Sequence, residues 1–280
     1  MKKISRRSFL AAAAVSVAAL ALTACGGSAS TASSAAASSV AASSEAASTS
    51  AAAAELTTVE AGKLTMATNA TFPPYEMTTD AGTIEGIDVD TAQAIAEKLG
   101  LELQIDDMDF DAALLSVQQG KADIAMAGIT VTDERMAVMS FSDSYATGIQ
   151  SIIVPEGSDI ASPDDLAGKK IGTQRGTTGY IYCSDDFGDE NVVAYDDGLT
   201  AVQALNNGQV DAVVIDNAPA QEFIAANPGL KILDTSYAEE DYAIGMAKNS
   251  PLEDAVNSVL EELKADGTLQ AIVDKYITAE

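Results

Sequence analysis

The sequence predicts an α/β protein with two lobes of similar plan. Two segments about ninety residues apart each begin with an aspartate, continue through four apolar residues and end in a polar group. They run from Asp123 to Gly128 and from Asp211 to Asp216. Each segment completes a strand–helix–strand–helix–strand order, which predicts a parallel sheet covered by helices. The recurrence of this pattern of an aspartate, four apolar residues and a polar end therefore indicates two lobes of the same plan.

The first lobe alternates short strands with amphipathic helices. Apolar residues at helical spacing follow Asp90, which is expected to cap a helix that stops at Gly100. The expected elements are a strand at 63–67, this helix, a strand at 101–105, a helix through 113–117 that stops at Gly120, and a strand at 124–127.

The second lobe repeats this order, and two helices complete the chain. The turn Gly176-Thr177-Thr178-Gly179 is typical of a helix start. The expected elements of this lobe are a strand at Ile171, a helix after this turn, a strand at 192–194, a helix through 202–205 that stops at Gly208, and a strand at 212–215. Near the end of the chain we expect a helix capped by Ser250, with an apolar stripe from Leu252 to Leu263. A last helix is expected to bury apolar residues between 269 and 276.

A leader and a tether precede this body. Residues 1–25 combine a basic start with an apolar run too short and too alanine-rich for a spanning helix, which indicates a secretory signal peptide. The run ends in Leu22-Thr23-Ala24-Cys25, which resembles a bacterial lipobox and predicts lipidation of Cys25; an ordinary signal peptide with an incidental cysteine is the alternative. Arg6 and Arg7 also match a twin-arginine motif, so the export route stays open. Residues 26–55 are almost entirely Ala and Ser and are expected to form a flexible tether about 30 Å long.

Composition excludes several kinds of chemistry. The chain has no histidine, which excludes a Ser-His-Asp triad, a Cys-His dyad and His-ligated zinc. Apart from Cys25, the only cysteine is Cys183, so no intrachain disulfide is expected. The acidic run 185–190 lacks the spacing of a calcium loop, and a solvated turn is the preferred interpretation. No metal or other cofactor is predicted, although acid–base catalysis by carboxylates alone stays possible.

The charge of the chain bears on its partners. Four basic residues belong to the leader, and their removal takes the formal net charge from −27 to −31. So acidic a surface is repelled by nucleic acid and by anionic lipid. We therefore expect no nucleic-acid partner and membrane contact only through the lipid anchor.

The two strand ends predict a shared binding cleft. In open α/β sheets, ligands bind beyond the carboxyl ends of the strands, where Gly128 and Asp216 lie. Arg135 falls in the first turn of a short helix, where a cation opposes the helix dipole. An arginine in that place suits a carboxylate ligand, and Asp216 suits an ammonium group, so the pair describes a free amino acid. The alternative is that Arg135 forms an ordinary surface salt bridge.

The order and spacing of several motifs resemble the solute-binding proteins (family 3, polar amino-acid type) of bacterial ABC importers, including glutamine-binding protein. The resemblance covers nearly the whole body, from about Leu64 to Tyr276. The motifs that carry it are Ala67-Thr68-Asn69, Phe72-Pro73-Pro74-Tyr75-Glu76, Gly86-Ile87-Asp88-Val89-Asp90, Met108-Asp109-Phe110, Gly128-Ile129-Thr130-Val131-Thr132-Asp133-Glu134-Arg135, Gln174-Arg175-Gly176-Thr177-Thr178-Gly179 and Asp211 to Asp216.

This resemblance implies a two-lobed, type II periplasmic-binding-protein-like fold, with two α/β sandwich lobes joined by two hinge strands. The first lobe would comprise 56–149 and 241–280, and the second 150–240. The crossings would lie near 148–153 and 236–243. Closure of the lobes would bury the ligand and present a composite surface to a permease.

The resemblance also implies a role for each cleft residue. Two aromatic rings would sandwich the aliphatic part of the ligand. Arg135 would pair with the α-carboxylate, helped by Gly128, Thr130 and the backbone N–H of Thr178 at a helix start, and Asp216 would take the α-ammonium group. Asn69 and Gln174 would face the ligand side chain. The implied ligand-binding residues are Asn69, Phe72, Phe110, Gly128, Thr130, Arg135, Gln174, Thr177, Thr178 and Asp216.

Two departures keep the exact ligand open. Ile215 stands where glutamine-binding protein has a histidine, and Asn69 stands where it has an acid. The resemblance therefore implies a monomeric, non-enzymatic lipoprotein on the outer face of the cell membrane that binds a polar L-amino acid for an ABC permease. A cyclohexadienyl dehydratase-like enzyme on the same fold, and a sensor domain for a partner receptor, are the alternatives.

Overall fold

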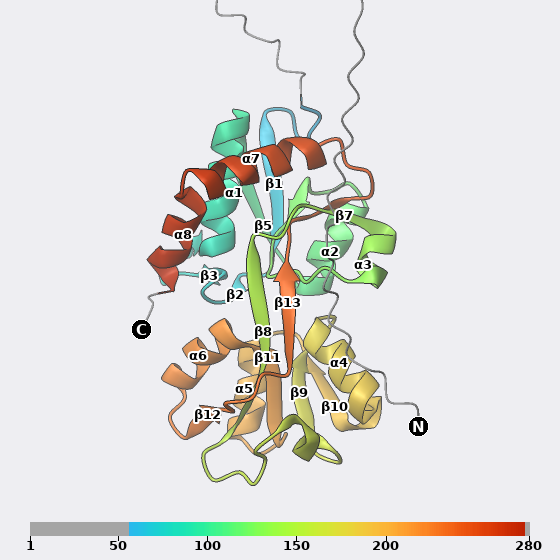
Figure 1. The fold of residues 1–280 in the computed structure, drawn as a ribbon, viewed down its shortest axis with the longest axis vertical. Helices are drawn as coiled ribbons and strands as arrows, with labels where there is room; N and C mark the ends of the chain where they lie inside the picture. The colour runs from blue at the N-terminus through green and yellow to red at the C-terminus, as the bar shows by residue number, and fades with distance from the viewer. Residues whose placement is uncertain (1–55, 278–280) are drawn as a thin grey trace, which may run out of the picture. The chain divides into compact units, whose positions relative to one another are not determined.

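Two sheets, one in each lobe, organise residues 56–277, the part of the chain that the computed structural model describes (Figure 1). These residues belong to one unit, Ala52–Glu280. The predicted signal peptide with Cys25 and the predicted tether lie outside the described residues.

The sheet of the first lobe has the order β5-β1-β6-β14-β7. β1 (Lys63–Thr68) pairs in parallel with β5 (Glu102–Asp107) and with β6 (Ile124–Ala125). β14 (Gly245–Ala247) lies antiparallel between β6 and β7 (Met139–Phe141). The three parallel strands are those that the sequence predicts, and the two antiparallel strands at the other side complete the sheet.

The sheet of the second lobe has the corresponding order β10-β9-β11-β8-β12. β9 (Ile171–Gln174) pairs in parallel with β10 (Val192–Tyr195) and β11 (Ala212–Asp216). β8 (Ala146–Pro155) is antiparallel to β11 and to β12 (Leu230–Ile232). Both lobes thus place their second, first and third parallel strands side by side and then add antiparallel strands, which confirms the predicted likeness of plan.

Helices and a small third sheet complete the lobes. Helices α1, α2, α3, α7 and α8 belong to the first lobe, and α4, α5 and α6 belong to the second (Figure 1). The remaining elements are α1 (Ile87–Leu99), α2 (Phe110–Gln118), α3 (Asp133–Val138), α4 (Thr178–Phe187), α5 (Gly198–Asn206), α6 (Asn217–Ala226), α7 (Glu253–Ala265), α8 (Thr268–Tyr276), η1 (Pro163–Leu166), η2 (Asp189–Asn191), and the sheet of β2 (Thr71–Phe72), β3 (Glu76–Thr78) and β4 (Ile84–Glu85).

Within residues 56–277, none of the helices has the length and apolar character needed to span a bilayer.

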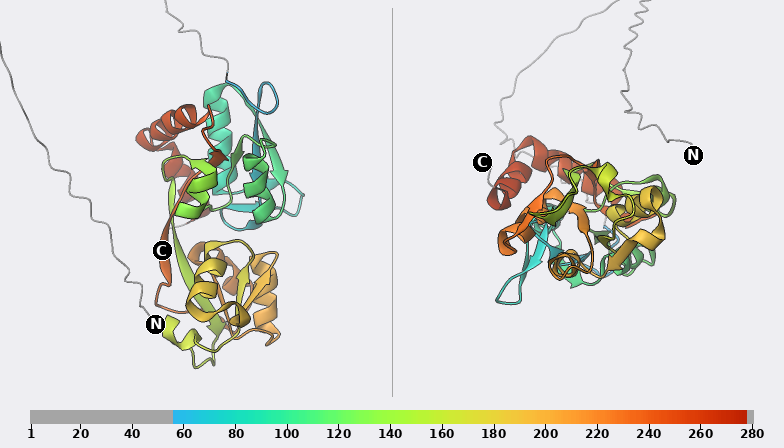
Figure 2. Two further views of the ribbon diagram at one scale, coloured as in Figure 1. Left: turned by 90° about the vertical axis from the view of Figure 1, so that its right-hand side faces the viewer. Right: turned by 90° about the horizontal axis from the view of Figure 1, so that it is seen from below.

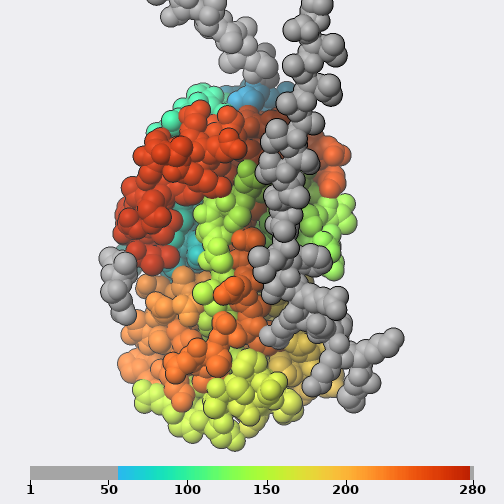
Figure 3. Space-filling model, in the orientation of Figure 1, coloured from blue at the N-terminus to red at the C-terminus, as the bar shows by residue number. Residues whose placement is uncertain are grey.

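Two strands connect the lobes. β8 and β13 (Ala238–Tyr242) pair antiparallel from Ala146 opposite Tyr242 to Gln150 opposite Ala238. Seen from the side, both lie along one edge of the two lobes (Figure 2), and their atoms are exposed between the lobes in the space-filling view (Figure 3). The predicted crossings near 148–153 and 236–243, and the predicted boundaries at 149/150 and 240/241, fall on these two strands.

Three of the differences between the predicted and observed element ends have a clear physical cause. α1 begins at Ile87 and not after Asp90, because the carbonyls of Pro74 and Tyr75 accept the first two N–H groups, at 3.0 and 2.9 Å, and no side-chain cap is needed. Asp90 instead pairs with Lys275 at 2.7 Å.

The other two differences lie at β6 and α7. β6 ends at Ala125, two residues early, because the chain leaves the sheet toward Gly128, whose φ of 55° is left-handed. α7 begins at Glu253 and not directly after Ser250, since Ser250 Oγ accepts from Leu252 N in a turn that precedes the helix.

The aspartates that precede β6 and β11 make the same contact in both lobes. Asp123 N donates to Thr65 O (2.9 Å) and Asp123 Oδ2 accepts from Thr65 N (2.8 Å). Asp211 N donates to Lys170 O (2.8 Å) and Asp211 Oδ2 accepts from Lys170 N (2.8 Å). Each side chain therefore extends the ladder of a parallel strand pair by one step before the strand begins.

We predict that Asp123→Asn destabilises the fold more than Asp211→Asn does. The Asp123 carboxylate also accepts from Val59 N at 2.7 Å and is buried, whereas the bond from Lys170 to Asp211 is exposed. The amide replaces one acceptor oxygen with a donor, which should cost about 1–3 kcal/mol at the buried site and less at the exposed one. Urea unfolding measures both variants; an equal or larger loss for Asp211→Asn would contradict this account of the two strand starts.

Candidate ligand-binding site

A cleft between the lobes holds all of the predicted ligand-binding residues. The empty space between its walls, including the part open to solvent, is about 450 Å³. The lining residues are Asn69, Phe72, Glu76, Phe110, Ala127, Gly128, Thr130, Arg135, Gln150, Gln174, Thr177, Thr178, Val214, Ile215, Asp216 and Tyr242.

Arg135 is a buried cation without a carboxylate partner. It lies in α3, where its backbone N–H donates to Oγ1 of the N-cap residue Thr132 at 3.2 Å. The residue is 8% exposed. Nη1 donates to Thr130 O (2.8 Å) and Nη2 to Gly176 O (3.1 Å). None of the ion pairs among residues 56–277 includes Arg135. Burial lowers the pKa of its guanidinium, partly opposed by the charge of Glu240.

The predicted alternative, a surface salt bridge, is therefore wrong. Two neutral carbonyls hold the guanidinium in place and leave most of its five donors for another acceptor. Burying a guanidinium costs free energy unless its charge is compensated, and a ligand carboxylate in the cleft would have the geometry to compensate it.

The start of α4 faces the same end of the cleft. Thr177 caps this helix by accepting from Tyr180 N at 3.4 Å, and Thr178 opens its first turn. N–H groups in a first turn have no partner within the helix and favour anions. Thr178 Oγ1 lies 3.4 Å from Thr130 Oγ1 of the first lobe. Arg135, Thr130 and the α4 N-terminus thus form an anion-binding end of the cleft.

Asp216 is a buried anion without a cationic partner among residues 56–277. It ends β11, caps α6 by accepting from Ala218 N (3.1 Å), and is 2% exposed. Its Oδ2 accepts from Ile149 N and from Tyr242 Oη, both at 2.8 Å. Burial raises the pKa of Asp216 to about 6, although these hydrogen bonds lower it. The carboxylate is therefore poised to gain from a cation in the cleft.

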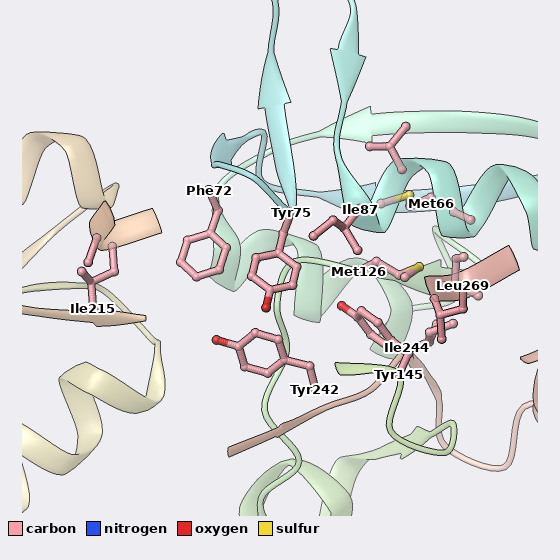
Figure 4. Packing of buried hydrophobic residues seen from close by; sticks show 14 of the residues in the cluster. Met66, Phe72, Tyr75, Ile87, Met126, Tyr145, Ile215, Tyr242, Ile244 and Leu269 are labelled. Carbon is pink, nitrogen blue, oxygen red and sulfur yellow. The ribbon is translucent and has the colours of Figure 1, made fainter. Parts of the chain in front are cut away.

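The aromatic residues form one wall, and Gly128 makes room for it. Phe72 stacks on Tyr75 with ring centroids 5.8 Å apart, and Figure 4 shows both near Tyr242, with Ile215 of the second lobe across from them. A Cβ on Gly128 would lie 2.7 Å from the Phe72 ring. Phe110 is not only core, because its ring lies 5.3 Å from the Arg135 guanidinium carbon in a cation–π contact.

The backbone N–H of Gly128 is already engaged. It donates to Asp88 Oδ2 at 3.1 Å, while Tyr145 Oη donates to Asp88 Oδ1 at 2.7 Å. The implied hydrogen bond from Gly128 N–H to a ligand carboxylate therefore competes with Asp88, and the carbonyl of Gly128 is the group left for a ligand.

Two amide side chains meet across the cleft. Gln174 Nε2 donates to Asn69 Oδ1 at 2.8 Å, and Asn69 Nδ2 donates to Met108 O at 3.0 Å. With the bonds from Arg135 to Gly176 and between Thr130 and Thr178, this contact holds the two lobes together over the cleft. The structure is therefore a closed arrangement of the lobes.

Sequence reasoning missed three polar residues of the lining. Gln150 and Tyr242 lie on the crossing strands, where Gln150 Nε2 donates to Glu240 Oε2 at 2.9 Å. Glu76 is fully buried, and burial, then the charge of Asp88, raises its pKa well above the usual range. Neither carboxyl oxygen of Glu76 has a hydrogen-bond partner among the described residues. Of these three residues, only Glu76 lies within a motif of the resemblance, the segment 72–76.

Other chemistry-bearing groups lie apart from the cleft. Cys183 is buried in the second lobe, and burial raises the pKa of its thiol to about 12. Within residues 56–277 no group of three or more acidic, histidine or cysteine side chains converges on a point where a metal would bind.

The fold and the site together define a two-lobed binding protein of the type II periplasmic class, which solved structures of this class match. The chain belongs to the bacterial extracellular solute-binding proteins, family 3, whose family model matches residues 64–279. Amino-acid-binding proteins of ABC transporters are among its relatives.

Three comparisons illustrate the likeness. The chain is 31% identical over 226 residues to the L-cystine-binding protein TcyJ of Escherichia coli (strain K12), covering 79% of this chain and 85% of that protein. The arginine-, lysine-, histidine-binding protein ArtJ from Geobacillus stearothermophilus matches with a TM-score of 0.75 and 34% identity, covering 78% of this chain and 96% of that one. An ancestral arginine-binding protein bound to glutamine matches with a TM-score of 0.74 and 40% identity, covering 78% and 99%.

We predict that the ligand-free protein becomes more stable as the pH falls from 7.5 to 5. Burial raises the pKa values of Asp88 and Asp216 to about 6, so the native state binds more protons than the unfolded state between about pH 4 and 6. Protonation in that window should add about 2 kcal/mol, or roughly 4–8 °C in melting temperature.

Thermal melts of protein stripped of ligand by unfolding and refolding test this expectation. Asp216→Asn removes one of the two groups and should reduce the gain. A melting temperature that declines steadily from pH 7.5 to 5 would mean that these carboxyls are not held protonated by burial.

Proposed function

We propose that this protein binds a free polar L-amino acid between its lobes and delivers it to an ABC importer, working as a monomer held on the outer face of the cell membrane by a lipid on Cys25. The observation that carries the proposal is the pairing of two buried, uncompensated charges in one small cleft, Arg135 and Asp216. An amino-acid zwitterion neutralises both at once.

The α-carboxylate binds at the Arg135 end. The guanidinium offers two parallel N–H groups, Thr130 offers its hydroxyl, and Thr178 offers its backbone N–H at the start of α4. The α-ammonium group binds Asp216, with the Gly128 carbonyl as a second acceptor. These contacts recognise the part that all amino acids share.

The ligand side chain occupies the rest of the cleft. Its aliphatic part lies between Phe72 and Phe110, and its polar end meets Asn69 and Gln174, with Thr177 beside them. Amides donate and accept, so they suit a polar group. The relatives bind cystine, arginine, lysine or histidine, and one binds glutamine, which supports a polar amino acid without selecting one.

Closure couples binding to transport. Within residues 56–277, two strands connect the lobes, and the contacts Arg135–Gly176 and Asn69–Gln174 form between the lobes across the cleft. A ligand that touches both lobes favours the closed form, and the permease then recognises the joined outer surface.

The location follows from the leader. A basic start, an apolar run and the lipobox at Cys25 support export and lipidation, and the Ala/Ser tether lets the body move above the membrane. The sensor alternative rests on no separate observation.

The enzyme alternative needs a carboxylic acid that reaches the substrate. Burial raises the pKa of Glu76, a carboxyl of the lining, which favours its neutral form, but both of its oxygens are buried. Incubation with arogenate or prephenate, followed by a search for product, tests this alternative directly.

We expect a thermal-shift screen of the twenty L-amino acids and L-cystine to find a stabilising ligand, and charge-removing variants to lose it. A ligand at one hundred times its Kd should add about 2.7 kcal/mol of stability.

Arg135→Ala leaves the ligand carboxylate unpaired and should weaken binding by several hundred-fold or more, about 3–5 kcal/mol. Arg135→Lys should recover only part of this loss. Asp216→Asn should abolish most binding but keep the cap on α6.

Matched controls come from the same segments. Arg175→Ala removes an exposed arginine that pairs with Asp196 at 3.6 Å, and Asp211→Asn changes the start of the same strand. Both should bind as the wild type does. Calorimetry that finds Arg135→Ala or Asp216→Asn within threefold of the wild type would sink the amino-acid assignment, as would a screen without a single stabilising amino acid.

We predict that Cys25→Ala releases the protein from the membrane fraction without changing its affinity, because the tether separates anchor from cleft. Cys183→Ala is the control and should stay with the membrane. Fractionation after a high-salt wash decides the question, and a Cys25→Ala protein that stays bound would rule out the lipid anchor.

A further inference from the structure

We propose that Tyr242 is a positioning residue whose hydroxyl holds Asp216 in the ionised, cleft-facing form that an ammonium group requires. This inference rests on the proposed function, since it assigns a task at the same ammonium site. Tyr242 lies outside every motif of the sequence that pointed to binding, and its place in the fold alone suggests the role.

The hydroxyl contacts the carboxylate directly. Tyr242 Oη donates to Asp216 Oδ2 at 2.8 Å, and Tyr242 is 1% exposed. The other donors to this carboxylate are the backbone groups Ile149 N and Ala218 N. Tyr242 therefore supplies the only side-chain hydrogen bond to Asp216 among residues 56–277.

The backbone of Tyr242 is held by the first lobe. It ends the crossing strand β13, forms an antiparallel bridge with Thr130, and its carbonyl accepts from Tyr145 N at 2.9 Å. The next residue, Ala243, donates to Ile129 O at 3.0 Å. The hydrogen bond from Tyr242 to Asp216 thus joins the end of β13, which the first lobe holds, to the end of β11 in the second lobe.

The ring is confined from three sides, which fixes the direction of the hydroxyl. A Cβ on Gly148, on the neighbouring crossing strand, would lie 2.4 Å from Cζ of the Tyr242 ring. The ring of Tyr75 packs edge-on at 5.4 Å between centroids, and Gly128 lies on a third side. Figure 4 shows the Tyr242 hydroxyl directed away from the core of the first lobe, toward the side where Ile215 lies.

The other side chains around Asp216 do not stabilise its ionised form. Glu240, also on β13, raises the pKa of Asp216 by its negative charge, and Tyr75 packs near the same carboxylate. Arg135 is the cation of the cleft, and its donors engage Thr130 and Gly176. The hydroxyl of Tyr242 is the largest of the effects that lower the pKa of Asp216, which burial raises to about 6.

Tyr242→Phe tests the inference, because it keeps the ring and removes the hydroxyl. The pKa of Asp216 should then rise, so the acid limb of binding moves to higher pH. For a rise of about one unit in the pKa of Asp216, the ratio of variant to wild-type Kd should stay within about threefold at pH 8.0. The ratio should grow to roughly fivefold at pH 6.0 and roughly tenfold at pH 5.0. Asp88 and Glu76 titrate in both proteins and cancel in this ratio.

Calorimetry uses the tightest-binding of L-glutamine, L-arginine, L-histidine and L-cystine as probe. Tyr237→Phe is the matched control, since Tyr237 Oη donates to Asp186 Oδ2 at 2.7 Å from a buried site of the second lobe outside the cleft lining. It should lower the melting temperature and leave the Kd unchanged at every pH.

The outcomes separate the two proposals. A ratio that grows as the pH falls supports the positioning role. A ratio that is constant with pH, whether one or larger, overturns it and leaves Tyr242 a packing residue while the proposed function stands. If none of the four probes, and no amino acid of the thermal-shift screen, binds the wild type at any pH, the amino-acid function fails and the inference fails with it.

Discussion

Two opposite charges buried on the two walls of one cleft, each without a protein counter-ion among the described residues, are the constraint on which the rest of the site depends. Removing a guanidinium and a carboxylate from water costs several kcal/mol each unless they are compensated. Neutral hydrogen-bond partners hold Arg135 and Asp216 in place but do not cancel their charges. The cleft therefore holds an electrostatic imbalance that the proposed amino-acid zwitterion would relieve.

The duplicated plan is what sets these charges opposite each other. In each lobe, a parallel strand that begins at a ladder-extending aspartate ends at the cleft, so the same construction delivers Gly128 from one side and Asp216 from the other. Within residues 56–277, β8 and β13 connect the lobes, an arrangement suited to hinge closure. Of the buried hydrophobic clusters, one lies in each lobe and a third, larger one takes residues from both.

Hydrogen-bonded carboxylates stiffen both walls of the cleft. Tyr145 donates to Asp88, which also takes the N–H of Gly128, and Tyr242 donates to Asp216. In each case a tyrosine next to or on a crossing strand fixes an acid that would otherwise be costly to bury. The geometry of the site is therefore linked to the strands that connect the lobes.

The sequence by itself predicted the two α/β lobes and, largely through a family resemblance, most of the residues that line the cleft. Strand and helix periods are local properties, and strand ends such as Gly128 and Asp216 follow from them by the rule that parallel sheets bind at their carboxyl edges. It did not determine the short antiparallel strands, the early start of α1 at Ile87, or the contacts of Glu76, Gln150 and Tyr242. Those depend on partners far along the chain, such as the carbonyls of Pro74 and Tyr75 that replace a helix cap. Only the tertiary structure decided that Asp88 occupies the Gly128 N–H and that Tyr242 reaches Asp216, because hydrogen bonds between segments distant in sequence are set by packing and leave no periodic signal.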